Sequence, residues 1–213
     1  MIYKDLFARQ IAEYLLEIQA VKLSPEKPYT WTSGWKAPIY CDNRLILSYP
    51  DIRNYIFAKL KEALLFHFSD SQSVAGVATA GIPASSVIAH DLHMPQAYVR
   101  GKAKGHGREN RIEGKLEQGT KCVVIEDLIS TGGSSLDAVK ALKEGGVLIN
   151  GVLALFSYDF DAAHKAFEDE SYPLVTLCDY HKLLEVALEK NYVAQHQMAT
   201  LKEWRNAPDK WGQ

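Results

Sequence analysis

A segment in the middle of the chain carries the clearest structural signal. It reads Val123-Val124-Ile125-Glu126-Asp127-Leu128-Ile129-Ser130-Thr131-Gly132-Gly133-Ser134-Ser135. Its apolar start is typical of a buried strand, two carboxylates follow, and a glycine pair among hydroxyl side chains leads into a helix expected over 136–144. A strand that turns through such a loop into a helix points free backbone N–H groups at the loop. This arrangement suits the binding of a phosphate monoester.

The acid pair Glu126 and Asp127 needs its own explanation, because carboxylates repel phosphate. The pair suits a ligand that also carries neutral hydroxyls and a metal ion near its phosphate, as a ribose 5-phosphate with Mg2+ does. An ordinary strand and turn with solvated acids is the alternative, but it leaves the order of apolar run, acid pair and glycine pair unexplained. A Walker-type loop fits less well, since no Gly-Lys-Ser/Thr follows and no lysine lies inside the loop.

Composition limits the class of protein. The length of 213 residues and the hydrophobic content of 47% suit one core, so we expect a single domain over 1–213, with about 20–50 forming a small irregular subdomain. The net charge of −2 argues against nucleic-acid binding. Cys41, Cys122 and Cys178 lack metal-ligand spacing and indicate free thiols in a reducing cytosol. Without a membrane-length apolar run or a signal pattern, we expect no membrane association and a cytoplasmic location.

Strands and helices are expected to alternate along most of the chain. Strands are expected at 74–78, 96–99, 121–126, 149–156 and 173–178, and helices at 6–19, 51–68, 82–90, 136–144, 180–190 and 196–204. This alternation predicts an α/β fold with a central, mainly parallel twisted sheet flanked by helices. Ligands of such sheets bind at the carboxyl ends of the strands.

A second motif is a cationic, glycine-rich segment. It reads Tyr98-Val99-Arg100-Gly101-Lys102-Ala103-Lys104-Gly105-His106-Gly107-Arg108. It has no apolar anchor, so ordering it costs backbone entropy that little burial offsets. We therefore expect a mobile flap over a site where a polyanion reacts. A solvated surface loop is the competing interpretation of any such run of charges.

Two shorter motifs accompany these. Thr79-Ala80-Gly81 follows a predicted strand, where a plain tight turn and a phosphate-binding turn both fit the tripeptide. The segment 30–44 contains Ser33-Gly34-Trp35-Lys36-Ala37-Pro38 and is rich in aromatic residues. Tyr40 is a candidate for stacking on a flat ring. For Lys36, neutralising a bound anion and lying on the surface are both open.

Together these motifs resemble the orotate phosphoribosyltransferases, a family within the type I phosphoribosyltransferases, over most of the chain up to Phe156. The resemblance implies the type I phosphoribosyltransferase fold with a small N-terminal hood. It implies an enzyme of pyrimidine biosynthesis that transfers ribose 5-phosphate from phosphoribosyl pyrophosphate to N1 of orotate. It also implies Mg2+ as cofactor, and a homodimer in which the basic loop acts across subunits.

The resemblance assigns roles to individual positions. The catalytic residues it implies are Arg100, Lys102, Lys104, His106 and Asp127. The substrate-binding residues it implies are Glu126, Asp127, Leu128, Ile129, Ser130, Thr131, Gly132, Gly133 and Ser134, with Thr79, Ala80 and Gly81 for pyrophosphate and Tyr40, Lys36 and Ser130 for the base. No protein side chain is implied as a direct metal ligand, since Mg2+ binds mainly through the substrate's pyrophosphate and ribose hydroxyls.

The chain departs from the family pattern in three places. Gly101 stands where some relatives carry lysine, with Lys102 one step further on. Thr32 stands where some carry lysine, and the 157–159 region lacks the arginine that some carry after that strand. The group that binds the orotate carboxylate is therefore open. Two rivals also remain: a phosphoribosyltransferase for another base, such as a purine, and a non-enzymatic regulator that keeps the phosphoribosyl-pyrophosphate pocket.

Overall fold

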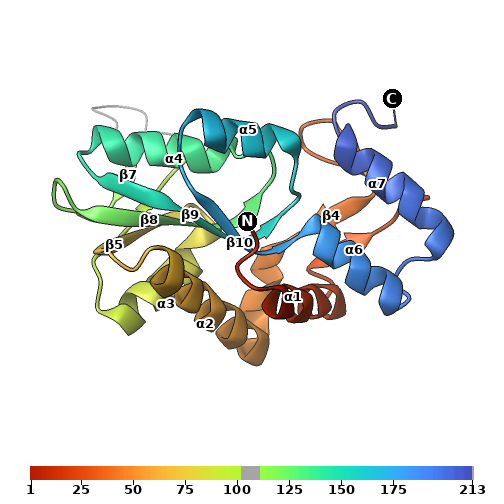
Figure 1. Ribbon diagram of the computed structural model, residues 1–213, viewed down its shortest axis with the longest axis horizontal. Helices are drawn as coiled ribbons and strands as arrows, with labels where there is room; N and C mark the ends of the chain where they lie inside the picture. Colours follow the sequence, from red (N-terminus) through yellow and green to blue (C-terminus); the bar gives the residue numbers. More distant parts are fainter. Residues whose placement is uncertain (102–110, 213) are drawn as a thin grey trace.

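A six-stranded sheet forms the centre of the computed structural model, which describes residues 1–101 and 111–212 (Figure 1). The strands are β5 (Ser73–Val77), β6 (Gln96–Val99), β7 (Ile112–Glu113), β8 (Lys121–Ile129), β9 (Leu148–Ser157) and β10 (Leu174–Asp179). Their order is β10-β9-β8-β5-β6-β7, and only β7 pairs antiparallel with its neighbour. The predicted α/β fold with a mainly parallel sheet is confirmed.

Helices cover both faces of this sheet. They are α1 (Asp5–Glu17), α2 (Pro50–His67), α3 (Gly81–Leu92), α4 (Gly133–Glu144), α5 (Asp161–Asp169), α6 (Tyr180–Glu189) and α7 (Met198–Asn206), with a 3-10 turn η2 (Gln195–Gln197) before α7. In Figure 1, α4 and α5 lie on one face, while α1, α2 and α3 lie on the other. The middle strands β8 and β9 are buried on both sides, which explains their nearly continuous apolar sequences.

A small subdomain, the hood, precedes α2. It contains β1 (Val21–Leu23), β2 (Tyr29–Thr30), β3 (Lys36–Ala37), β4 (Ile39–Cys41) and the 3-10 helix η1 (Asn43–Ser48). β1 pairs antiparallel with β4, and β2 pairs antiparallel with β3. Ala37 and Ile39 are fully buried, and the Trp31 indole N–H donates to the carbonyl of Ile39 at 3.0 Å. These contacts fix the hood in place despite its short strands.

The structure corrects the predicted ends of two elements. β8 was expected to end at Glu126 but continues to Ile129, because Leu128 and Ile129 pair with Phe156 and Ser157 of β9. The acid pair therefore lies within the part of β8 that pairs with β9, and not in the loop after the strand. α4 begins at Gly133 rather than at residue 136, so the hydroxyl-rich residues 134 and 135 belong to its first turn.

Two elements were not predicted at all. Strand β7 lies just beyond the cationic segment 98–108, where no strand was expected, and its two residues are too few to produce a pattern. Helix α5 has only two buried residues, Ala163 and Phe167, so its apolar face is too sparse to read from the sequence. Of the helices that the structure describes, none is both long enough and apolar enough to cross a membrane. The three cysteines are unpaired, as expected.

Candidate active site

The predicted motifs meet at the carboxyl ends of neighbouring strands. The turn 78–80 follows β5, the loop 130–132 follows β8, and Tyr158 follows β9. β8 lies between β5 and β9 in the sheet, so the three connections are adjacent. This is the edge of a parallel sheet where ligands bind.

Glu126 is held rigidly at this edge. Its carboxyl group accepts hydrogen bonds from the hydroxyl of Ser135 at 3.0 Å, from the hydroxyl of Ser134 at 3.4 Å and from the backbone N–H of Asp127 at 3.1 Å. The side chain of Asn43 in η1 donates to the carbonyl of Asp127 at 2.8 Å and ties the hood to the acid pair. Hydroxyls of α4 and an amide of the hood thus position the two acids. Asn43 and Ser135 had not been singled out from the sequence.

Burial changes the protonation of the acid pair. Glu126 is only 5% exposed. Burial, reinforced by the charge of Asp127, raises the pKa of Glu126 to about 8. Burial also raises the pKa of Asp127, while its hydrogen bond to Glu126 and the nearby Arg44 act in the opposite direction. A carboxyl group that keeps its proton near neutral pH repels a bound phosphate less and can donate a hydrogen bond.

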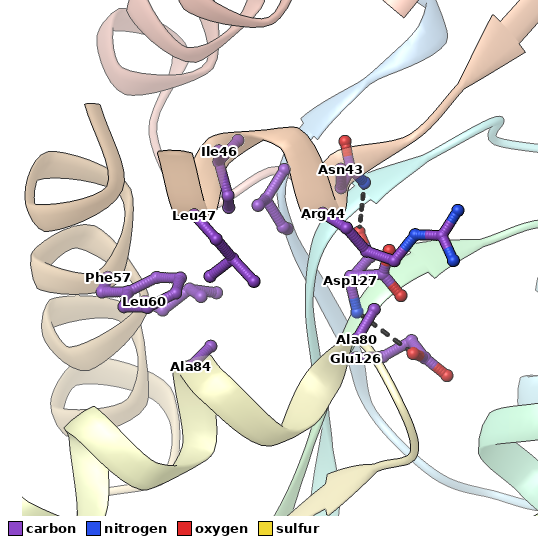
Figure 2. A pocket seen from close by; sticks show the side chains of 11 residues that line it. Asn43, Arg44, Ile46, Leu47, Phe57, Leu60, Ala80, Ala84, Glu126 and Asp127 are labelled. Atoms are coloured by element: carbon purple, nitrogen blue, oxygen red, sulfur yellow. Dashed lines mark hydrogen bonds between the residues drawn. The ribbon is translucent and has the colours of Figure 1, made fainter. Parts of the chain in front are cut away.

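Arg44 is a second feature that sequence reasoning missed. Figure 2 shows its side chain leaving η1 beside Asp127, and its positive charge acts to lower the pKa of that acid. Its guanidinium group donates to both carboxylate oxygens of Asp42, at 2.7 and 2.9 Å. A small cavity here is lined by Asn43, Arg44, Ile46, Leu47, Phe57, Leu60, Ala80, Ala84, Glu126, Asp127 and Leu155. Arg44 is the one cation among these lining residues, and its charge favours the ionised form of Asp127.

The loop after β8 has the geometry expected of an anion site. Gly132 adopts a positive φ of 84°, and a Cβ there would lie 2.8 Å from the ring of Phe167, so glycine is required. α4 starts at the next residue and directs the free N–H groups of its first turn, at Gly133 and Ser134, toward the loop. Thr131 is exposed, and Ser130 is half-buried.

Two predicted contact residues of β8 face apolar surroundings. Ile129 is 1% exposed in the core that packs under α4 and α5, and its carbonyl accepts from the N–H of Tyr158 at 2.9 Å. Leu128 is half-buried and lines the pocket beneath the hood. Leu128 therefore offers an apolar side chain to a ligand, whereas the side chain of Ile129 serves packing.

The Thr79-Ala80-Gly81 turn lies against the acid pair. Thr79 is exposed, Ala80 lines the small cavity beside Glu126 and Asp127, and Gly81 begins α3. A Cβ on Gly81 would lie 2.4 Å from the backbone carbonyl oxygen of Ile125, so only glycine lets α3 approach β8 this closely. The peptide between Ala78 and Thr79 is cis.

A pocket of about 540 Å³ opens between the hood and the loop after β8. It is lined by Thr30, Trp31, Thr32, Ser33, Trp35, Tyr40, Cys41, Leu128, Ser130, Thr131 and Tyr158. Tyr40 and Ser130, both predicted to contact a base, line it together. Lys36 is not among the lining residues; its ammonium group donates to the hydroxyl of Thr30 at 2.7 Å instead. Tyr158 joins this wall without any sequence signal that pointed to it.

The cationic segment is described only at its ends. Lys102, Lys104 and His106 lie outside the described residues. Arg100 is half-buried, with Nε 3.3 Å from a carboxylate oxygen of Glu113. The N–H of Arg100 donates to the carbonyl of Arg111 at 2.9 Å, so the two ends of the segment meet in the β6–β7 stem.

Glu126→Gln is expected to flatten the pH dependence of stability. Folding raises the pKa of Glu126 from 4.5 to about 8, so the folded chain keeps a proton that the unfolded chain releases. The stability of the parent is therefore full below the unfolded pKa and falls as the pH rises toward the folded pKa. Glutamine cannot ionise and removes this loss. Thermal unfolding measured between about pH 5 and pH 8 tests this. The exposed Glu168→Gln is the control, and identical pH profiles for parent and Glu126→Gln would contradict the assignment.

Comparison with known proteins agrees with this geometry. The family model described as phosphoribosyl transferase domain matches residues 47–189. An orotate phosphoribosyltransferase of Listeria innocua is 53% identical over 96% of this chain and 98% of that protein. One of Cytophaga hutchinsonii is 49% identical over 96% of this chain and 98% of that protein. The crystal structure of the Aeropyrum pernix orotate phosphoribosyltransferase superimposes with a TM-score of 0.76 at 26% identity, covering 86% of this chain and 99% of that one. The chain belongs to the phosphoribosyltransferase family, among its orotate phosphoribosyltransferases.

Proposed function

We infer that this chain is an orotate phosphoribosyltransferase. It transfers the ribose 5-phosphate of phosphoribosyl pyrophosphate to N1 of orotate, giving orotidine 5′-phosphate and pyrophosphate in the synthesis of UMP. One observation carries this inference beyond family membership. The anion loop after β8, the acid pair and the Thr79–Gly81 turn lie side by side, next to a pocket with an aromatic wall.

The sugar phosphate fits the order of these groups. The loop from Ser130 to Ser134 and the start of α4 hold the 5′-phosphate through backbone N–H groups and hydroxyls. Glu126 and Asp127 hold the two ribose hydroxyls. A protonated Glu126 suits this role, because it donates a hydrogen bond and adds no negative charge close to the phosphate. Binding at several fixed points orients the anomeric carbon for attack.

The base and the leaving group occupy the two sides of the sugar. Orotate enters the pocket beneath the hood, with Tyr40 on its flat face and Ser130 at its edge. Pyrophosphate lies on the Thr79-Ala80-Gly81 turn, beside the acid pair. Arg100, Lys102, Lys104 and His106 are proposed to contact pyrophosphate, on the strength of the family resemblance of the segment 98–108.

The chemistry requires no protein nucleophile. Displacement at the anomeric carbon builds positive charge on the ribose ring and negative charge on the departing pyrophosphate. Asp127, the acid of the pair that the nearby Arg44 favours in its ionised form, supplies negative potential near the ring, and the cations of the basic segment stabilise the leaving group. Closure of that segment over the site would keep water from the reacting ribose.

Mg2+ is part of the proposal. The carboxyl oxygens of Glu126 and Asp127 are the kind of donor that Mg2+ takes up in proteins. The ion is proposed to be held mainly by the substrate's pyrophosphate and ribose hydroxyls, as the family resemblance implies. When bound, the ion offsets the charge that develops on pyrophosphate.

We further propose a homodimer in which the basic segment of one subunit acts at the site of the other, and a cytoplasmic location. The dimer rests on the resemblance of the segment 98–108. The location rests on the unpaired Cys41, Cys122 and Cys178, which are typical of proteins in a reducing compartment.

A side-by-side assay of bases tests the function. The purified chain with phosphoribosyl pyrophosphate is expected to form a nucleotide from orotate, but not from uracil, adenine or hypoxanthine. Chelation of Mg2+ with EDTA is expected to abolish the reaction, and added Mg2+ to restore it. A purine nucleotide product would contradict the choice of base. Tight binding of phosphoribosyl pyrophosphate without turnover of any base would favour a regulator.

A further inference from the structure

The C-terminal helix α7 lies outside the matched phosphoribosyltransferase domain, which covers residues 47–189, and so do the four strands of the hood, β1 to β4. These two segments meet at the base pocket. We propose that Trp204 of α7 is a positioning residue for this pocket. It holds the rings of Trp31 and Tyr158 in position and thereby controls the affinity for the base but not the affinity for phosphoribosyl pyrophosphate. The proposal rests on the proposed function, which places the base in this pocket.

Trp204 packs directly behind the pocket wall. It is fully buried, and its ring lies 5.6 Å from that of Trp31 at 81° and 5.6 Å from that of Tyr158 at 86°. Trp31 and Tyr158 are themselves in contact, with ring centroids 5.1 Å apart, and both line the pocket. Edge-to-face packing of this kind holds rings at defined angles. The inner surface of the pocket therefore depends on a side chain that does not line it.

Two further rings pack against Trp204. Its ring lies 5.3 Å from Phe160 and 5.3 Å from Tyr180. The Tyr180 hydroxyl donates to the carbonyl of Leu201 at 3.1 Å and so fixes α7 against α6. Trp204 thus fills the space between the hood on one side and the end of β9 with α6 on the other.

Two further contacts hold the C-terminal segment in this position. Arg205 donates to the backbone carbonyl of Asp159 and to the carboxylate of Asp161, the latter at 2.9 Å. Gly212 lies against the hood strand β3, since a Cβ there would be 3.2 Å from the Cβ of Lys36. The segment 198–212 therefore contacts both the turn that carries Tyr158 and the outer strand of the hood.

The phosphoribosyl side of the site has separate supports. Glu126 is held by Ser135 of α4, and the carbonyl of Asp127 by Asn43 of η1. The conformation of the anion loop depends on Gly132, which packs against the ring of Phe167. Removing the indole of Trp204 should therefore loosen Trp31 and Tyr158 while these supports remain in place.

Four variants test this proposal. Trp204→Leu removes the ring, and Trp204→Phe keeps part of it as a conservative replacement. Lys202→Ala is the control on the exposed side of the same helix. Phe68→Leu is the control for general destabilisation, because Phe68 is 5% exposed and packs beside Gly151 near the amino end of β9, away from the site. For each variant we would measure KM for orotate, KM for phosphoribosyl pyrophosphate, kcat and thermal unfolding.

Trp204→Leu is expected to raise KM for orotate at least about tenfold and KM for phosphoribosyl pyrophosphate less than about twofold, with Trp204→Phe recovering most of the difference. Phe68→Leu is expected to lower the unfolding temperature without changing the ratio of KM for orotate to KM for phosphoribosyl pyrophosphate. If Trp204→Leu does not fold, Trp204→Phe decides, because it should still raise KM for orotate by about two- to threefold while KM for phosphoribosyl pyrophosphate stays at the parent value. Equal changes in both KM values, or none in folded Trp204 variants, would overturn the proposal. A parent that forms no orotidine 5′-phosphate would instead reject the proposed function.

Discussion

Lys104→Ala is expected to lower turnover by about 10²–10³-fold, the usual cost of losing one group that stabilises charge in a transition state. Lys104 lies outside the described residues, and its role rests on the resemblance of the basic segment. Because the segment has no apolar anchor, thermal unfolding should not change. Steady-state kinetics and a thermal scan of the same preparation measure both quantities. Equal turnover in variant and parent would reject a catalytic role for this lysine.

The Lys104→Ala variant, mixed with a second variant, Asp127→Asn, also tests the proposed dimer. Asp127→Asn should weaken use of phosphoribosyl pyrophosphate, because it changes a hydroxyl-binding acid in the site. If the basic segment acts across subunits, a mixture of Lys104→Ala and Asp127→Asn subunits contains some sites with neither defect. Activity in the mixture should then exceed that of either variant alone. No recovery after verified subunit exchange would place the segment in its own subunit's site.

Gly81→Ala is expected to damage both stability and activity. The added Cβ would lie 2.4 Å from the carbonyl oxygen of Ile125, a contact that forces α3 away from β8. Overpacking of this kind costs roughly 1–3 kcal/mol of stability. This clash moves Gly81, the last residue of the Thr79–Gly81 turn, away from Ile125, the residue before Glu126. Because both places belong to the proposed site, KM for phosphoribosyl pyrophosphate should rise as well. Chemical denaturation and substrate titration measure the two effects.

Gly101→Ala is the matched control for stability, because a Cβ at Gly101 would meet no atom of the described residues within 4 Å. Its free energy of unfolding should equal that of the parent within a few tenths of a kcal/mol. A Gly81→Ala variant as stable as Gly101→Ala, with unchanged substrate affinity, would show that α3 tolerates the added methyl group. The close packing of α3 on β8 would then not be what positions the acid pair.

Local chemistry made much of the site predictable. The acid pair, the glycine turn with its positive φ at Gly132 and the Thr79–Gly81 turn are each continuous in sequence, and each lies in or directly after the carboxyl end of a strand with a clear apolar pattern. Patterns of this kind depend on neighbours along the chain. The prediction that they meet at one edge followed from the rule that parallel strands end on the same side.

Residues that act through contacts distant in sequence were not predictable. Asn43 reaches Asp127 across 84 positions, and Arg44 faces the same acid from the hood. Neither leaves a periodic or compositional signal. The full extent of β8 was also missed, because Leu128 and Ile129 continue the strand only through pairing with β9.

The α/β alternation, the anion loop and the acid pair could be predicted from residues close together in the chain, because propensity, turn chemistry and apolar periodicity act over a few residues. Tertiary structure alone decided the raised pKa of Glu126, which comes from burial, and the aromatic wall that joins Trp31 and Tyr158 to Trp204. Burial and ring packing are properties of groups brought together from distant positions, so no local pattern records them.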